Sequence, residues 1–299
     1  MFSRRLLLIT IQRPCAKMTK VKIPNYMLAS TTVALGGLLN GLDTGCIGAL
    51  VAMDQFTASI GHLSPTLLGF TVSLIMLTGS VPSVFAGQLA ERFGRLKIII
   101  LGVLIFLIGV ILQGSAGALT QFLIGRAIAG LGEGVFLSNM SVYICEIAPV
   151  KRRGMLAGLP QFLATTGVCV GYFLCYGTVH ISSSMAWRLP HIFQASIALL
   201  TAGLCWRLPE SPRWLVHHGR RTEALAALQR LDFGMAEAEK DILSAVNEQN
   251  LSLGAWQGFT LLFKKGYRTR TVLALFVLGM VQLSGIDGVL YVSSPHLQT

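Results

Sequence analysis

Long stretches without a charged side chain alternate along the chain with short segments that carry most of the charge. The charge-free stretches are residues 23–42, 55–90, 98–125, 154–187, 189–206 and 271–286. A helix that crosses a bilayer needs about 20 apolar residues, and the longer stretches exceed that length because they include loops. The pattern therefore predicts seven membrane helices. Their expected bounds are residues 26–51, 66–88, 97–117, 121–144, 154–177, 189–208 and 269–292.

Residues 209–268 follow a different pattern, in which apolar positions recur at helical spacing among charged ones. Leu225, Leu228 and Leu231 show this spacing, which is typical of short amphipathic helices. The chain is therefore expected to divide into four parts. These are an N-terminal segment (1–25), a bundle of six transmembrane helices (26–208), a helical linker (209–268), and a seventh transmembrane helix with the end of the chain (269–299).

The composition excludes an ordinary soluble enzyme. Hydrophobic residues make up 53% of the chain and charged residues 12%, about half the charged share of a soluble domain. The sequence shows no paired nucleophile and base and no phosphate-binding loop, and its six cysteines have no metal-binding spacing. We therefore expect an all-α membrane protein with no enzyme activity, no cofactor and no metal.

The positive charges lie on one side of the predicted membrane. Of the 24 Lys and Arg residues, 22 fall in residues 1–22, 92–97, 151–153 and 207–270, and the loops near 52–65, 114–121 and 178–186 have none. The positive-inside rule puts the basic side, with the N-terminus and the linker, in the cytoplasm. The net charge of +11 therefore indicates topology and an attraction to membrane lipids rather than nucleic-acid binding.

Four ionisable residues lie within predicted membrane helices, where they are costly and indicate function. They are Asp43, Arg126, Glu133 and Asp287. At 1.5 Å per residue, Asp43 and Arg126 reach the same depth on helices of opposite direction, so the two can pair. The pair is either part of a proton-coupling device or a static buried ion pair. Glu133, two turns beyond Arg126, is either a second partner for that arginine or faces a cavity.

Five motifs follow one another along the chain. They are Gly36 to Gly45, Gly87 to Lys97, Gly125-Arg126 with Tyr143 and Glu146 to Gly154, Pro209 to Val216, and Gln282 to Ile286. In this order they resemble the signature of the sugar porter branch of the major facilitator superfamily. The similarity runs from about residue 26 to residue 292, and the overall sequence resembles that of fungal hexose or polyol transporters. The sequence departs from the family pattern at Asn40, Leu42, Ser141, Val281 and Asp287.

The resemblance implies a carbohydrate transporter of the multi-pass type in the plasma membrane, which works by alternating access and symport with protons. Its partners would be a monosaccharide or polyol, protons and membrane lipids. Asp43 would carry the proton, with Arg126 and Glu133 as its neighbours. Gln161 and Gln282 match the family's sugar-contacting amides, and Asp287 lies five residues beyond Gln282.

Charged residues at the predicted cytoplasmic helix ends form a further group. They are Glu91, Arg92, Arg95, Glu146, Arg152, Arg153, Glu210 and Arg213. The resemblance implies a cytoplasmic gate, in which ion pairs hold the outward-facing state and break when the protein opens inward. Trp187 and Trp206, near the ends of the sixth helix, are interpreted as anchors at the membrane interface.

The predicted plan contains one six-helix half of the family fold, built from two three-helix repeats, and one helix of the other half. The family has five more helices after the seventh. We therefore expect residues 1–299 not to transport sugar alone. Two alternatives are a transporter-like sugar receptor and a non-functional fragment of a transporter gene.

Overall fold

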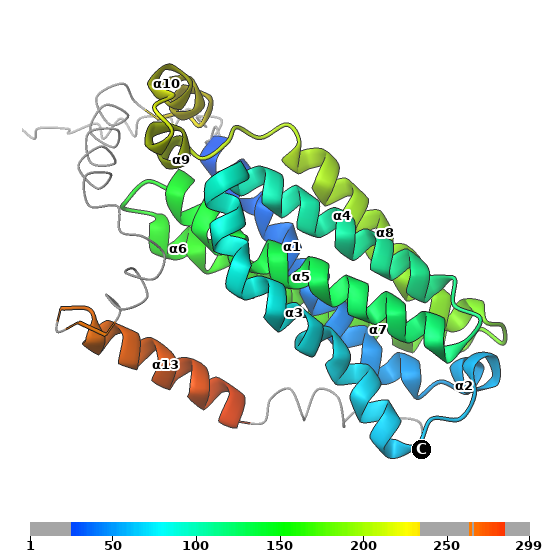
Figure 1. Cartoon of the computed structure of the whole chain (residues 1–299). Helices are drawn as coiled ribbons and strands as arrows, with labels where there is room; N and C mark the ends of the chain where they lie inside the picture. Colours follow the sequence, from blue (N-terminus) through cyan, green and yellow to red (C-terminus); the bar gives the residue numbers. More distant parts are fainter. Residues whose placement is uncertain (1–24, 234–262, 265, 285–299) are drawn as a thin grey trace, which may run out of the picture.

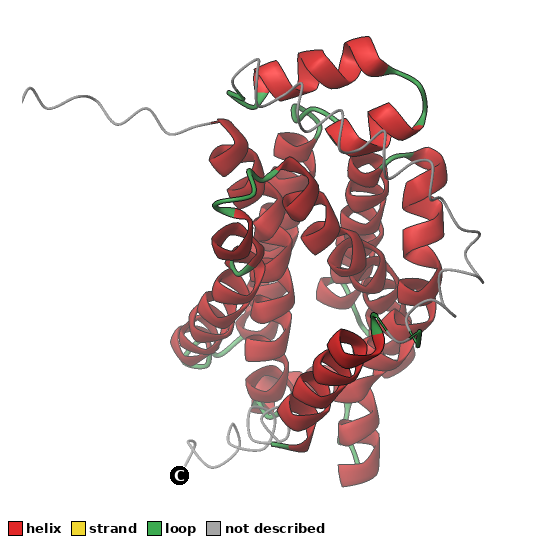
Figure 2. Ribbon diagram, turned by 90° about the vertical axis from the view of Figure 1, so that its left-hand side faces the viewer, coloured by secondary structure: helices red, strands yellow, loops and turns green. Residues whose placement is uncertain are grey.

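The described part of the chain is entirely helical. The computed structural model describes residues 25–233, 263–264 and 266–284, and Figures 1 and 2 show helices joined by short loops throughout this part. The long helices are α1 (Asn25–Val51), α3 (Pro65–Phe93), α4 (Arg95–Gly114), α5 (Leu119–Ile147), α7 (Leu159–Thr178), α8 (Met185–Cys205) and α13 (Arg268–Leu283). The short helices are α2 (Asp54–Ile60), α6 (Arg153–Ala157), α9 (Pro212–His217) and α10 (Arg221–Arg230).

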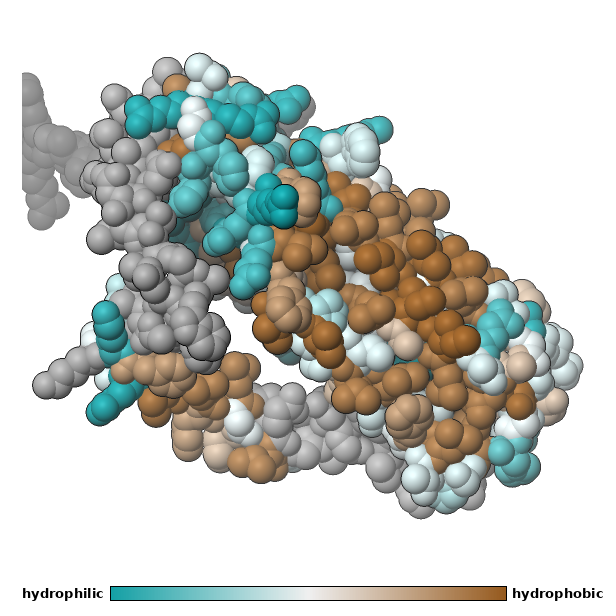
Figure 3. All heavy atoms as spheres, viewed as in Figure 1, coloured by the Kyte–Doolittle hydropathy of each residue, from teal (hydrophilic) through white to brown (hydrophobic). Residues whose placement is uncertain are grey.

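Five helical spans are long and apolar enough to cross a membrane. They are α1, α3, α4, α5 and the segment Arg153–Thr178, which joins α6 and α7. The sides of the bundle carry exposed apolar side chains such as Leu77, Val84, Ile108 and Leu199. Figure 3 shows hydrophobic atoms along the sides of the helices, with many hydrophilic atoms gathered near α9 and α10. This distribution is the one expected of helices surrounded by lipid.

Small residues bring the helices close together. α1 packs along α7, while α5 packs along both α3 and α4. A Cβ atom on Gly41 would lie 1.9 Å from the carbonyl oxygen of Ala164 in α7, and one on Gly134 would lie 2.0 Å from that of Gly79 in α3. Only glycine allows these backbones to approach so closely, as is common between membrane helices.

Several helix boundaries differ from the predicted ones, and two of the differences have clear local reasons. α3 continues past residue 88 to Phe93 and ends at Gly94, whose φ of 109° lies in a region that favours glycine. The predicted helix 154–177 is divided at Gly158 into α6 and α7. Pro160, in the first turn of α7, has no N–H to donate to the preceding turn, so the hydrogen-bond ladder is interrupted there.

The short helix α2 was not expected, and it overturns the interpretation of Trp187 as an interface anchor. Trp187 has no exposed surface, whereas Trp206 is 78% exposed. The ring of Phe56 in α2 packs edge-on against that of Trp187 with centroids 5.5 Å apart. Gln55 of α2 donates hydrogen bonds to the carbonyls of residues 179 and 181. α2 therefore covers this end of the bundle and buries the tryptophan.

Candidate functional site

A buried ion pair joins α1 to α5. Nη1 of Arg126 lies 3.2 Å from Oδ2 and 3.3 Å from Oδ1 of Asp43, and the side chains are 0% and 4% exposed. Nη2 of Arg126 donates to the carbonyl oxygen of Val72 in α3, at 3.1 Å. One arginine therefore ties together three helices. A charged pair in this position is stable only while both partners keep their charges.

A cavity of about 250 Å³ opens beside this pair, between α1, α3 and α5. It is lined by Asn40, Asp43, Thr44, Ile75, Met76, Gly79, Ser83, Glu133, Gly134, Leu137 and Ser138. Amides, carboxylates and hydroxyls in such a lining donate and accept the hydrogen bonds that a hydroxylated ligand requires. Because Asp43 lines the cavity and also pairs with Arg126, its carboxylate connects the two features.

Glu133 faces this cavity. Its Oε1 accepts a hydrogen bond from Nδ2 of Asn40 in α1, and its Oε2 is buried without a hydrogen-bond partner among the described residues. The structure therefore places Glu133 in the cavity wall with Asn40 as its donor. Its link to α1 runs through the Asn40 amide, one turn before Asp43.

Of the three predicted sugar-contacting residues, the structure places only the side chain of Gln161. Gln161, in the first turn of α7, is exposed and does not line the cavity. Gln282 belongs to α13, but its side chain lies outside the described residues, as does the whole of Asp287. Their roles stay predictions.

At the end of the bundle that carries α9 and α10, here called the linker end, some of the predicted gate residues meet. Nε of Arg95 lies 3.5 Å from Oε1 of Glu146, and Nη2 of Arg95 lies 3.8 Å from Oε1 of Glu91. Arg95 thus joins the first turn of α4 to the ends of α3 and α5. The Arg95–Glu146 pair is largely shielded, with side chains 14% and 15% exposed.

Glu210 links the linker to the same helices. Its Oε1 accepts hydrogen bonds from the backbone N–H of Leu96 at 2.9 Å and of Ser211 at 3.1 Å. It therefore caps the N-terminus of α4, where a negative charge is favoured. Nε1 of Trp214 in α9 donates to the carbonyl of Glu91 at 2.7 Å. These bonds hold α9 against the ends of α3 and α4.

The other predicted gate residues make different contacts. The guanidinium of Arg92 lies over the ring of Phe93, 5.5 Å from its centroid. Arg152 donates to the sulfur of Met27 and Arg153 to the carbonyl of Ala148. Arg213 also makes a contact.

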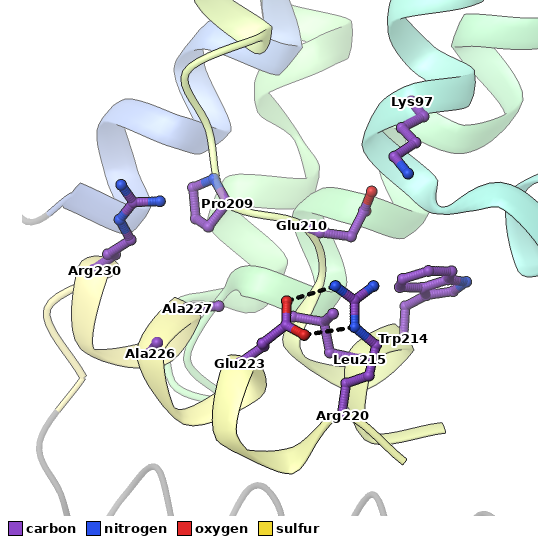
Figure 4. Close-up of a pocket in the computed structure, with 10 residues that line it drawn as sticks. All are labelled: Lys97, Pro209, Glu210, Trp214, Leu215, Arg220, Glu223, Ala226, Ala227 and Arg230. Atoms are coloured by element: carbon purple, nitrogen blue, oxygen red, sulfur yellow. Dashed lines mark hydrogen bonds and ion pairs between the residues drawn. The ribbon is translucent and has the colours of Figure 1, made fainter. Parts of the chain in front are cut away.

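A hollow of about 330 Å³ lies between Glu210 and α10 (Figure 4). Lys97 extends toward it from α4, and Arg230 lies on its far side. Arg220 donates two hydrogen bonds to the carboxylate of Glu223, at 2.7 and 2.6 Å, which raise the pKa of the Arg220 guanidinium. The hollow therefore lies among charged side chains, and two of them, Arg220 and Glu223 at the start of α10, pair with each other.

Several polar residues of the same helices were not expected at the site. Ser83 and Ser138 line the cavity, while Gln113 of α4 and His191 of α8 are buried in the bundle. A count of Asp, Glu, Lys and Arg in apolar helices does not include Ser, Gln or His, so it does not identify these positions. An uncharged amide or imidazole within an otherwise apolar helix is the signal that identifies such positions.

Known proteins resemble this chain over most of its length. The family described as "Sugar (and other) transporter" matches residues 29–298. The low-affinity glucose transporter HXT3 of Saccharomyces cerevisiae is 32% identical over 269 residues, which cover 85% of this chain and 47% of the relative. The arabinose-proton symporter of Bacillus subtilis is 32% identical over 272 residues, with 89% and 57% covered. The chain spans about half the length of the curated relatives it matches.

Solved structures show the same helical arrangement. The xylose transporter XylE from E. coli, in a partially occluded inward-open conformation, matches with a TM-score of 0.71 and 25% identity over 90% of this chain and 67% of that one. XylE bound to 6-bromo-6-deoxy-D-glucose matches with a TM-score of 0.72 and 24% identity, over 90% and 62%. These matches confirm the predicted all-α membrane fold of a transporter rather than an enzyme. Since the family match extends over residues 29–298, the chain belongs to the sugar transporter family of the major facilitator superfamily.

Proposed function

We propose that this chain supplies the N-terminal half of a proton-coupled sugar transporter that works by alternating access. The observation that carries the proposal is the position of Asp43, which lines a polar cavity and also pairs with Arg126. A carboxylate in this position can exchange a proton with the cavity, and the same proton controls the ion pair.

The proposed coupling follows from electrostatics. While Asp43 is ionised, its attraction to Arg126 holds α1 against α5. A proton from the cavity neutralises Asp43 and removes that attraction, so the two helices can separate at lower cost. Glu133, with Asn40 as its donor, forms part of the same proton-coupling group and faces the same cavity. Binding of sugar and of the proton then favour the same movement.

We infer that the substrate is a monosaccharide or polyol. Asn40, Ser83 and Ser138 present amide and hydroxyl groups in the cavity wall, and such groups match the alternating donors and acceptors of a sugar. Gln161, Gln282 and Asp287 would complete the site from α7 and from the seventh helix and its end. Relatives named as a glucose transporter and as an arabinose-proton symporter support this class of substrate.

The linker end is proposed to lie in the cytoplasm of a plasma-membrane protein. Its basic residues support this orientation, since the segments 92–97, 151–153 and 207–230 all lie there. Arg95, with Glu91 and Glu146, would then form the centre of the cytoplasmic gate. Breaking these pairs would release the ends of α3, α4 and α5 and open the cavity inward.

An uptake experiment with Asp43→Asn tests the proposal. Residues 1–299 are fused to the last five helices of the Bacillus subtilis arabinose-proton symporter and reconstituted in proteoliposomes. We expect the fusion to accumulate sugar when an inward proton gradient is imposed. Asp43→Asn should abolish accumulation yet retain exchange of labelled for unlabelled sugar, because binding and rocking need no proton.

The exchange assay distinguishes a fusion that has lost proton coupling, which still exchanges sugar, from one that has not folded, which does not. A matched control is Thr31→Val, also in α1, whose exposed hydroxyl bonds to a carbonyl of its own helix and does not line the cavity, and which should retain uphill uptake. Accumulation against a gradient by the Asp43→Asn fusion would show that Asp43 is structural and that the proposed coupling is wrong.

A further inference from the structure

Three polar side chains are buried in the neighbouring helices α4 and α8. Gln113 of α4 is 0% exposed, and His191 and Gln194 of α8 are 2% and 1% exposed. Neither amide atom of Gln113 has a hydrogen-bond partner among the described residues, and the His191 ring and the Gln194 amide have none apart from each other. In folded proteins buried polar groups are almost always bonded, so a cluster of this kind indicates a partner that another state of the protein supplies.

The cluster lies next to the arginine. Cγ of Gln113 would be 2.8 Å from a Cβ atom placed on Gly125, the residue before Arg126. Cβ of His191 would be 3.1 Å from a Cβ atom placed on Gly114, the residue after Gln113. The His191 ring also packs edge-on against Phe122, one turn before Arg126, with ring centroids 5.9 Å apart. Arg126 therefore pairs with an acid on α1, while polar side chains of α4 and α8 lie near the turn of α5 that carries it.

Arg126 has a hydrogen-bond donor that no described residue accepts. Nη1 is used by Asp43 and Nη2 by the carbonyl of Val72, but Nε has no partner among the described residues. Amide oxygens and the unprotonated nitrogen of a neutral imidazole accept hydrogen bonds from a guanidinium. The rings of Phe122 and Trp187 pack on His191, so apolar side chains adjoin the cluster.

We propose that Gln113, His191 and Gln194 are positioning residues that hold the Arg126 guanidinium when Asp43 is neutral. The proposal rests on the proposed proton step, which leaves a buried arginine without its counter-charge. An unpaired buried charge is strongly destabilising, so the neutral state of Asp43 requires other acceptors. The three side chains supply them and make that state accessible.

The test measures the thermal unfolding of the purified 299-residue chain in detergent and needs no sugar or transport. Asp43→Asn imitates the neutral carboxyl, and Gln113→Leu with Gln194→Leu removes the two amides. In the unaltered chain this leucine pair should move the unfolding temperature little, because Gln113 has no partner to lose and Gln194 has only the His191 ring. In the Asp43→Asn chain it should lower the unfolding temperature by roughly 4–8 °C more, because a charged group then loses its hydrogen bonds.

Two controls identify the cause. Adding Arg126→Gln to Asp43→Asn should abolish the extra loss, because no cation then needs the acceptors. Asn139→Leu removes a buried amide of α5 that bonds to two backbone carbonyls, and it should cost the same in both backgrounds.

The proposal would be overturned if Gln113→Leu/Gln194→Leu lowered the unfolding temperature by the same amount with and without Asp43→Asn. An Asp43→Asn chain that fails to fold while Asp43→Asn/Arg126→Gln folds would also overturn it, because the acceptors would then have failed to hold the arginine. Sugar accumulation by the Asp43→Asn fusion would instead refute the proton step alone, so the two failures are distinguishable.

Discussion

Asn40 and Glu133 show how an uncharged residue makes a buried acid tolerable. The Glu133 carboxylate is 8% exposed, and one of its oxygens accepts a hydrogen bond from the Asn40 amide. A hydrogen bond to a charged group contributes about 1.5–3 kcal/mol, and leaving the charge without its donor costs at least as much.

Asn40→Leu should therefore destabilise the chain more than removal of both partners. We expect Asn40→Leu to lower the free energy of unfolding by about 1.5–3 kcal/mol, and Asn40→Leu/Glu133→Leu to recover most of that loss. Thermal unfolding of the purified variants measures both. Ser138→Ala is the matched control, because the Ser138 hydroxyl bonds only to a carbonyl of its own helix and its loss should be small. If Asn40→Leu/Glu133→Leu is no more stable than Asn40→Leu, the lost Asn40–Glu133 hydrogen bond is not the cause of the destabilisation.

At the scale of the helices, the sequence predicts that the long helices exist more reliably than it predicts where each one begins and ends. Charge-free runs identify the six long helices of the bundle, because exclusion of charge from the bilayer acts on every position. The charge-free run that ends at residue 90 does not indicate that α3 continues to Phe93, because the end of the helix depends on the backbone conformation of Gly94. α2 was missed because its burial of Phe56 and Trp187 depends on residues more than 100 positions apart. Contacts of this kind have no local pattern.

The contact between α1 and α7 depends on glycine. A Cβ atom on Gly41 would collide with backbone atoms of Ala164, the nearest at 1.9 Å, which cannot move as a flexible side chain can. We expect Gly41→Ala to destabilise the chain by about 1–3 kcal/mol, the usual range for overpacking. Gly69→Ala in α3 is the matched control, because nothing lies within 4 Å of the added atom. It should stabilise the chain by up to about 1 kcal/mol. Equal effects of the two changes on the unfolding temperature would contradict the close approach.

At the scale of the whole molecule, the distribution of charge divides the described bundle into two ends. The linker end carries basic residues from α4, α6, α9 and α10, while the end covered by α2 carries Arg188 close to the Trp187 ring. The sequence predicts this asymmetry because counting charges requires no knowledge of packing. It does not predict which charges pair: Arg95 joins Glu91 and Glu146, but Glu210 instead caps the N-terminus of α4.

Labelling of single cysteines tests the proposed orientation. Ser182→Cys lies between α7 and α8 at the α2 end, and Thr222→Cys lies on α10 at the linker end; both positions are exposed. In a cysteine-free background, a membrane-impermeant maleimide should label residue 182 in intact cells and residue 222 only after the cells are opened. The reverse pattern would show that the linker end faces outward, against the positive-inside expectation.

The final prediction concerns transport by residues 1–299 alone. The cavity beside Asp43 is bounded by α1, α3 and α5, and the described side chains of α13 after Arg268 are largely exposed. In transporters of this design, substrate binds between two six-helix halves that rock against each other. The described helices supply one such half, and nothing in them provides the opposing surface. We therefore expect the 299-residue chain in proteoliposomes to show no saturable sugar uptake, whereas its fusion with the last five helices of a relative transports. Both should be compared across hexoses, pentoses and polyols, with the mirror-image sugar as the control for leakage. Saturable, stereospecific uptake by the monomeric chain would overturn this prediction and place the whole pathway within one bundle.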